Sequence, residues 1–299
     1  MNEARGGRLV LVATPIGNLG DLSPRARDLL ATADLICCED TRRTRALLSA
    51  VGVRAGGEGG DRLLSLHGHN EAARLDRVAA AVAAGATVAI VSDAGTPGVS
   101  DPGAWLAAQL AASGETVSTV PGPSSVLGAL VVSGLPTDRF CVEGFLPRKG
   151  SERRHRIAAL MADERTSVVL EAPGRVAGTL AELAAADPER PAAVVRELTK
   201  LHEEVWRGRL ADAAEEFARR QARGEVVLVV GGAAAPEPAE DAAVEAAVRA
   251  ALGEDPSAGP RQVADRVAAS LGVQRRRAYE AALRIRAGAG GQAGPSGRA

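Results

Sequence analysis

The sequence has little of several features that would identify a particular class of protein. Only 2% of its 299 residues are aromatic, so the core must be built from Val, Leu and Ala, which an apolar content of 46% supplies. The formal net charge of −1 excludes a global field that would draw the chain to nucleic acid. Any contact with RNA must therefore come from local basic patches.

Cysteine, histidine and long apolar runs are also scarce. Cys37, Cys38 and Cys141 are too few and too unevenly spaced for a disulfide framework, and the first two are expected in the core. The four scattered histidines give no metal-binding pattern, so no metal is expected. The N-terminus lacks the apolar core of a signal peptide, and no stretch approaches the ~20 apolar residues of a membrane span. A cytoplasmic protein without a membrane partner is predicted.

Two common nucleotide-binding motifs are missing as well. There is no Walker A pattern, and no GxGxxG follows the first expected strand. The glycine-rich segment VAIVSDAGTPGVSDPG, residues 88–103, instead covers most of the fourth expected strand and the loop that follows it. Its glycines allow a close approach of the backbone to a ligand, and its prolines restrict the conformation of the loop before a ligand binds. A lone short glycine pattern indicates a turn as readily as a site.

This loop has four counterparts. All five lie at the ends of expected strands and carry reactive residues or residues with special backbone conformations. The other four are ATPIGNLGD (13–21), EDTRRTR (39–45), LSLHGHNE (64–71) and VPGPSS (120–125). Purely structural turns do not require reactive residues at five successive strand ends. A ligand site at the carboxyl ends of the strands is therefore predicted.

Alternating strand-like and helix-like segments predict an α/β fold. Strands are expected in the first half at 9–12, 35–38, 63–66, 87–92 and 117–120. Those of the second half are expected at 140–144, 167–171, 193–197, 203–207 and 226–230. Some of the later strands lie close together without an intervening helix, which predicts a mixed sheet with antiparallel pairs. Ser23 followed by Pro24 predicts a helix start, and a second helix is expected over 70–84.

The chain is expected to divide into two α/β domains and a small C-terminal part. The domains span 8–120 and 121–232, and a proline- and acid-rich linker follows at 233–241. Residues 242–286 read as a helical, helix-turn-helix-like appendage, with a break at Gly272 between 261–270 and 274–285. The glycine-rich tail 287–299 is expected to be disordered.

Eight motifs, taken in their order along the chain, resemble those of one protein family. ATPIGNL, CEDTRRT, LHGHNE, VSDAGTPGVSDPG, VPGPSS, GLPTDRFCVEGFLPRKG, VVLEAPGR and VRELTKLHEE occur here in the order found in the tetrapyrrole-methylase (class III) family, in the branch that methylates small-subunit ribosomal RNA. The resemblance covers about residues 8–232. It implies two α/β domains with S-adenosylmethionine in the cleft between them. It also implies a homodimer and the 2′-O-ribose methylation of a cytidine of 16S rRNA near the decoding centre.

The resemblance further implies which residues bind the cofactor. They are Pro15, Asp93, Gly95, Thr96, Ser124, Ser125, Leu170, Glu197 and Val227. The Asp93 carboxylate can accept hydrogen bonds from the amine or the ribose of the cofactor. Glu197 is equally suited to a salt bridge with Arg196 or Lys200. Three residues remain open as the general base, His67 for its intrinsic pKa and Glu39 or Asp40 if desolvated, unless the enzyme works by orientation alone.

Polar and basic side chains near the same strand ends are candidates for contacts with RNA. They are Asn18, Arg42, Arg43, Asn70, Arg148, Lys149 and Arg153. Charge runs are usually solvated faces, but two of them flanking one expected cleft favour phosphate binding. The run of three arginines at 275–277 is a third candidate patch, for which a solvated helix is an equal alternative.

Two other functions remain open at this level. One is a methyltransferase of corrin biosynthesis on the same fold, although a small macrocycle needs neither the basic stretches nor the appendage. The other is an RNA-binding protein without catalytic activity, which would show no calorimetric binding of S-adenosylmethionine.

Overall fold

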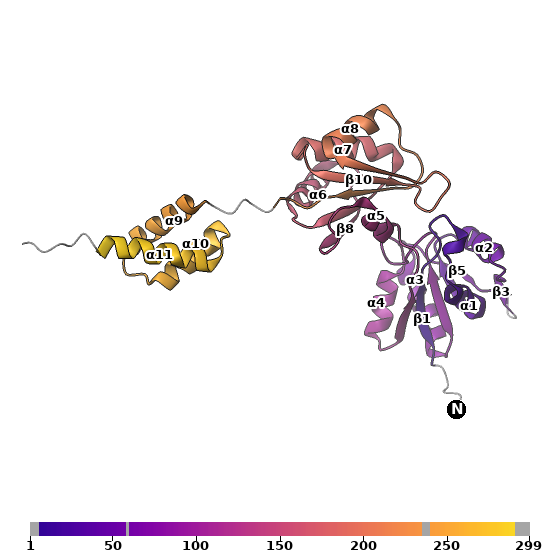
Figure 1. The fold of residues 1–299 in the computed structure, drawn as a ribbon. Coiled ribbons are helices and arrows are strands. Elements are labelled where there is room, and N and C mark those ends of the chain that lie inside the picture. The colour runs from indigo at the N-terminus through magenta and orange to yellow at the C-terminus, as the bar shows by residue number, and fades with distance from the viewer. Residues whose placement is uncertain (1–5, 58–59, 235–239, 291–299) are drawn as a thin grey trace, which may run out of the picture. The chain divides into compact units, whose positions relative to one another are not determined.

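The computed structural model describes residues 6–57, 60–234 and 240–290, and the chain divides into two compact units, residues 1–233 and 234–299 (Figure 1). The described part of the first unit contains two five-stranded sheets and a two-stranded hairpin, and that of the second unit is helical. Among the described residues, no helix combines the length and the apolar character needed to cross a membrane.

The first sheet has five parallel strands in the order β5-β2-β6-β1-β7. Their bounds are β1 Arg8–Val12, β2 Leu35–Cys38, β5 Leu63–Ser65, β6 Thr87–Val91 and β7 Thr116–Val120. Each lies within one or two residues of the predicted strand. The connecting elements are η1 Leu19–Asp21, α1 Pro24–Thr32, α2 Thr41–Ala50, α3 Glu71–Ala83, α4 Ala104–Ala112 and the hairpin β3 Gly56–Gly57 with β4 Gly60–Asp61.

Alternating side chains bury both faces of this sheet. Leu30 of α1 and Leu48 of α2 pack with Cys38 on one face. The helices α3 and α4 pack on the other face, where Cys37 is buried. The expectation that the two neighbouring cysteines are core residues is therefore confirmed. At the start of α1, the Ser23 hydroxyl accepts the Ala26 N–H at 3.1 Å, with Pro24 in the first turn, as predicted.

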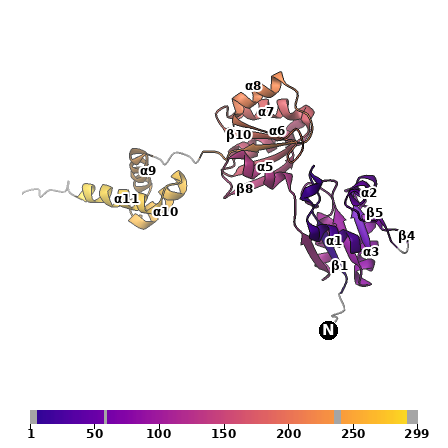
Figure 2. The same ribbon diagram turned by 45° about the vertical axis from the view of Figure 1, so that its right-hand side comes forward.

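The second sheet is mixed, in the order β11-β10-β12-β9-β8. Only β8 and β9 are parallel, and the other pairs are antiparallel, as the closely spaced strands predicted. The bounds are β8 Phe140–Phe145, β9 Thr166–Glu171, β10 Pro191–Arg196, β11 Glu204–Arg209 and β12 Val226–Val230. The accompanying helices are α5 Ser125–Ser133, α6 Gly150–Ala162, η2 Pro173–Arg175, α7 Val176–Ala186 and α8 Leu210–Arg219. Figure 2 shows α5 against one face of this sheet and α7 with α8 against the other.

The described part of the C-terminal unit, 240–290, contains three helices with a core of their own. The helices are α9 Asp241–Glu254, α10 Pro260–Leu271 and α11 Arg275–Gly290. Val248, Val263 and Ala282 are fully buried in it, and Gly272 ends α10 with φ +64°. The predicted helix, turn and helix are present. The expected disorder from residue 287 is wrong up to Gly290, where α11 continues. Residues 291–299 and most of the linker, 235–239, lie outside the described residues.

Candidate functional site

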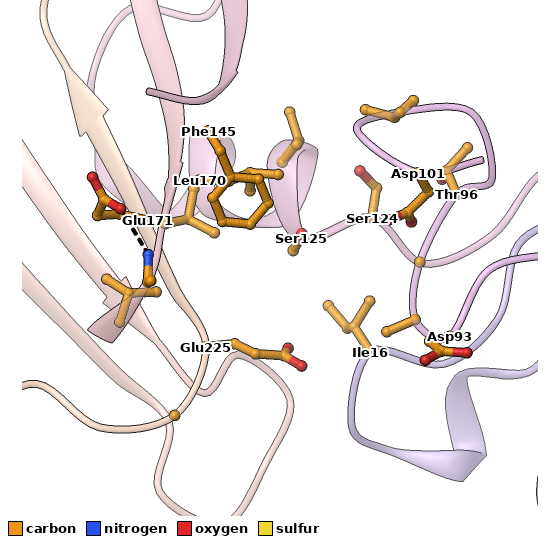
Figure 3. Close-up of a pocket in the computed structure, with 18 of the residues that line it drawn as sticks. Ile16, Asp93, Thr96, Asp101, Ser124, Ser125, Phe145, Leu170, Glu171 and Glu225 are labelled. Atoms are coloured by element: carbon orange, nitrogen blue, oxygen red, sulfur yellow. Dashed lines mark hydrogen bonds between the residues drawn. The ribbon is translucent and has the colours of Figure 1, made fainter. Parts of the chain in front are cut away.

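A cavity of about 430 Å³ lies in the first unit, where loops from both sheets meet. In Figure 3, Thr96, Asp101 and Ser124 lie on one side of it, and Phe145 and Leu170 lie on the other. Its volume is within the ordinary range for small-molecule sites. Its lining residues are Ile16, Glu39, Arg43, Asp93, Ala94, Gly95, Thr96, Val99, Asp101, Ser124, Ser125, Val126, Phe145, Leu170, Glu171, Ala172, Pro173, Gly224, Glu225, Val226 and Val227.

The strand order of the first sheet explains why the cavity forms there. From β1 the chain passes over β6 to reach β2, whereas from β6 it passes over β1 to reach β7. The loops that follow β1 and β6 therefore leave in opposite directions, which opens a crevice at the carboxyl ends of these two neighbours. Thr14 and Gly95 join the two loops by a bridge, with N–H···O distances of 2.9 and 3.0 Å.

Gly95 and its neighbours shape the cavity wall on the side of the first sheet. Gly95 has φ +85°, a conformation that favours glycine, and a Cβ there would meet Ile16 Cγ2 at 3.4 Å. The Thr96 hydroxyl donates to the Pro123 carbonyl at 3.2 Å, which ties this loop to the start of α5. Ser124 caps that helix by accepting the Leu127 N–H at 3.3 Å. These bonds fix the loop after β6 and the start of α5 on one side of the cavity.

The second sheet supplies an apolar wall held by a buried acid. Phe145 ends β8, and Leu170 and Glu171 end β9. The Glu171 carboxylate is buried, accepts the Thr179 hydroxyl at 2.7 Å and the Ala172 N–H at 2.8 Å, and pairs with Arg175. A buried carboxylate with this many donors fixes the backbone around it. It therefore holds the β9 end of the wall in place.

Seven of the nine cofactor candidates line this cavity: Asp93, Gly95, Thr96, Ser124, Ser125, Leu170 and Val227. Pro15 and Glu197 do not. Pro15 lines a neighbouring hollow with Asp93. Glu197 instead accepts the Lys200 ammonium at 2.9 Å and the Glu225 N–H at 2.8 Å, which lowers its pKa. The salt-bridge alternative therefore describes Glu197, with Lys200 as the partner, whereas Arg196 pairs with Glu204.

The three candidates for the general base lie in different environments. Glu39 lines the cavity, and burial, followed by the charge of Asp93, raises its pKa. Asp40 caps α2 through the Arg42 N–H at 2.8 Å, and its bonds to Arg42 hold its pKa well below the usual range. His67 is outside the cavity lining, and its Nε2 is 3.1 Å from the Asn70 amide. Of the three, only Glu39 faces the cavity.

Most candidates for RNA contact are exposed at or beside the cavity. Arg43 lines it and lies 3.3 Å from Asp93, yet 70% of its side chain remains exposed. Arg42 is 87% exposed although it pairs with Asp40. Arg148 and Lys149 are exposed and follow β8, whose last residue lines the cavity; Asn18 is exposed and caps η1. Asn70, in contrast, is engaged with the Ser65 carbonyl and the His67 N–H.

Arg153 cannot take the role expected for it. It is only 7% exposed, because its position on α6 faces the core of the second sheet. Its guanidinium donates to Glu182 at 3.0 Å, to the Pro147 carbonyl at 3.0 Å and to the Thr179 hydroxyl at 2.9 Å. The prediction that Arg153 contacts RNA is therefore wrong, and the residue has a structural role.

The arginine run of the C-terminal unit is internally paired. Arg275 pairs with Asp265, Arg276 with Glu280 at 2.8 Å, and Arg277 with Asp241 at 2.7 Å. Exposed salt bridges of this kind are weak and can exchange partners. While they are formed, the neighbouring carboxylates offset the positive charge that would attract a phosphate. The solvated-helix alternative thus describes this cluster in the free protein. In the described part of the chain, no group of three or more His, Cys, Asp or Glu residues is arranged to hold a metal ion.

Comparison with known proteins finds similarity to methyltransferases of one family. Residues 8–214 match the family of Tetrapyrrole (Corrin/Porphyrin) Methylases. The chain is 44% identical to the Ribosomal RNA small subunit methyltransferase I of Mycobacterium tuberculosis, over 97% of this chain and 99% of that protein. The protein of the same name from Xylella fastidiosa (strain Temecula1) is 48% identical over 76% of this chain and 82% of its own length. The fold is similar to that of a Thermus thermophilus uroporphyrin-III C-methyltransferase complexed with S-adenyl homocysteine, with TM-score 0.51 and 24% identity over 76% of this chain and 97% of that one.

Proposed function

Because the chain belongs to the tetrapyrrole methylase family, in the group of ribosomal RNA small subunit methyltransferases I, we propose that it methylates the 2′-hydroxyl of a cytidine in 16S rRNA near the decoding centre. The observation that carries this proposal is the 44% identity over 97% of the chain, because it includes both units. S-adenosylmethionine is the methyl donor.

The residues of the cavity suit this donor. S-adenosylmethionine carries a sulfonium and an amine, and five carboxylates line the cavity: Glu39, Asp93, Asp101, Glu171 and Glu225. The flat faces of the adenine ring pack well against apolar side chains, which Leu170, Val226 and Val227 provide. The capped start of α5 offers backbone N–H groups for a carboxylate. Volume, charge and apolar wall therefore match a nucleoside with a cationic tail.

The contribution of the protein to methyl transfer is mainly orientation. The bound donor supplies a methyl group on a positively charged sulfur, and in-line placement at about 3 Å from the acceptor oxygen lowers the barrier. The Thr14–Gly95 bridge and the Thr96–Pro123 bond hold the cofactor loop, and Glu171 holds the opposite wall. Arg43, at the cavity, offsets part of the negative charge that would repel an RNA backbone.

The function is tested by incubating purified unmethylated small subunits with the enzyme and labelled S-adenosylmethionine, followed by nucleoside mapping. Label on one 2′-O-methylcytidine is the expected result. Label transferred to a corrin precursor and not to RNA would favour the tetrapyrrole alternative. Calorimetry without detectable cofactor binding would favour a protein that only binds RNA.

Salt dependence tests the basic residues beside the cavity. If Arg42, Arg148 and Lys149 contact phosphates, replacing all three by Ala should reduce the slope of log affinity against log salt by about 2 to 3, at roughly 0.7 to 0.9 per contact. Affinity for S-adenosylhomocysteine should not change, because none of the three lines the cavity. Arg219→Ala, on α8 where the arginine pairs with Glu215, is the matched control. A triple variant with the wild-type slope would show that these residues form solvated faces.

We also propose that the enzyme is a homodimer. Leu127 and Val131, one turn apart on α5, are 52% and 66% exposed, and Val142 of β8 is 39% exposed. Large apolar side chains left exposed to solvent favour association. Sedimentation should give about twice the chain mass, and Val131→Glu should shift the protein towards the monomer. Leu283→Glu, which alters an exposed leucine of α11, should leave the dimer intact. A wild-type monomer at micromolar concentration would refute the proposal.

A further inference from the structure

The side of the cavity formed by the first sheet carries three carboxylates and one cation, Arg43. Glu39 follows β2, Asp93 follows β6, and Asp101 ends the glycine-rich loop before α4. Asp93 is held by two of its neighbours: it accepts the Asp40 N–H at 3.1 Å, and its carboxylate lies 3.3 Å from the Arg43 guanidinium. Asp101 was absent from the sequence-based candidates, although its motif was identified.

The loop that carries Asp101 is fixed from several sides. Gly98, Ser100 and Gly103 have φ values of +83°, +62° and +113°. A left-handed conformation at a non-glycine residue such as Ser100 costs free energy, so it persists only where the surroundings enforce it. A Cβ on Gly103 would meet Ile90 Cγ2 at 3.0 Å, so the chain passes close to β6 here. Asp101 is therefore held in a defined position at the cavity.

A buried acid beneath the loop completes this support. Glu71, at the start of α3, is 8% exposed, and its two carboxylate oxygens accept the Gly103 N–H at 3.1 Å and the Leu106 N–H at 3.2 Å. These bonds satisfy donors at the start of α4 that would otherwise lack partners. The final residue of the LHGHNE motif thus acts as a positioning residue for the loop of Asp101.

The surroundings of Asp101 favour its neutral form. Burial, followed by the negative charge of Glu39, raises its pKa from 3.8 to about 6. The charged groups that face it are Glu39, Arg43 and Asp93 from the first sheet, Glu171 and Glu225 from the second, Glu71 beneath the loop and His67 beyond Glu39. A carboxylate with a pKa of about 6 accepts a proton more readily than a carboxylate with an ordinary pKa, and it is still mostly ionised at pH 7 to 8.

We propose that the Asp101 carboxylate is the general base that accepts the proton of the ribose 2′-hydroxyl. This inference rests on the proposed function. In the balanced step, the ribose oxygen gains the methyl group, the C–S bond breaks with its electron pair remaining on sulfur, and the hydroxyl proton passes to Asp101 and then to solvent. Glu39 raises the proton affinity of Asp101 through its charge, and Asp40 remains the cap of α2.

Asp101→Asn is the first test. It removes the base but retains the size of the side chain, so kcat on small subunits should fall about 10²- to 10⁴-fold. Affinity for S-adenosylhomocysteine, which lacks the sulfonium charge, should stay within about twofold, since the role of Asp101 is in proton transfer and not in binding. For the wild type, kcat/KM should rise with pH through a midpoint near the Asp101 pKa of about 6, and the variant should lack that midpoint.

Measurements without cofactor or RNA provide the second test. Carboxyl NMR of the free enzyme should show one aspartate that titrates near about 6 and is missing in Asp101→Asn. The pKa of Asp101 in the folded state, about 6, lies above the ordinary value of 3.8. Its ionisation therefore destabilises the folded state as the pH rises between these two values. Asp101→Asn should therefore melt at a higher temperature than wild type near about pH 8, and the difference should shrink towards about pH 4.

Glu39→Gln serves as the matched control. It should lower the titration midpoint of Asp101, because it removes a neighbouring negative charge, and it should leave that carboxylate in place. Wild-type methylation of cytidine combined with an undiminished rate in Asp101→Asn would overturn this proposal alone. A loss of S-adenosylhomocysteine binding in Asp101→Asn would also overturn it, in favour of a cofactor ligand. A wild type that does not methylate RNA would instead refute the proposed function.

Discussion

Gly95→Val is expected to lower the affinity for S-adenosylhomocysteine by about 10- to 100-fold. A Cβ at Gly95 would contact Ile16 Cγ2 at 3.4 Å, and the additional methyl groups of Val must then extend into a cavity that Gly95 lines. The positive φ of +85° adds backbone strain, and the paired bonds to Thr14 resist relaxation. Isothermal calorimetry with S-adenosylhomocysteine measures the effect.

Backbone strain can be separated from filling of the cavity by a second glycine. Gly114 has φ +83°, almost that of Gly95, but a Cβ there would meet nothing within 4 Å, and it does not line the cavity. Gly114→Val should therefore reduce the melting temperature comparably and leave cofactor affinity unchanged. If Gly114→Val lost as much affinity as Gly95→Val, or if Gly95→Val lost none, the loop of Gly95 would not contact the cofactor.

Removal of residues 234–299 is expected to leave S-adenosylhomocysteine affinity unchanged and to slow methylation of small subunits by about tenfold at low substrate concentration. Every lining residue of the cavity precedes residue 228, and the C-terminal unit has a separate core. Ala233 should be retained, because its N–H donates to the Asp163 carbonyl at 2.7 Å. A tenfold change corresponds to about 1.4 kcal/mol of lost docking free energy.

The kinetic form of this loss identifies its cause. If the C-terminal unit adds affinity for the folded ribosomal substrate, truncation raises KM and leaves kcat intact. Because Arg275, Arg276 and Arg277 are already paired with acids, docking must either exchange these partners or use the shape of the helices. A truncated enzyme with wild-type KM and kcat on subunits would show that the unit has another role.

The local pattern of the sequence determined most of the fold. Apolar runs bounded by glycine and proline placed ten strands within a few residues, because strand ends depend on nearby residues. Motif order predicted the family, and the loops that follow β1, β2, β6 and β7 do meet around one cavity. The mixed character of the second sheet also followed from chain spacing, since short connections require antiparallel neighbours.

Burial and strand order were decided only by the tertiary structure. The order β5-β2-β6-β1-β7 places two loops distant in sequence at one crevice, and no local pattern encodes that pairing. Arg153 lies in a basic run in the sequence, yet its face of α6 turns it into the core. Asp101 is one polar residue among many until a left-handed turn and the buried Glu71 place it beside Glu39. Desolvation and charge proximity depend on contacts between distant segments, so these properties emerge only from the folded chain.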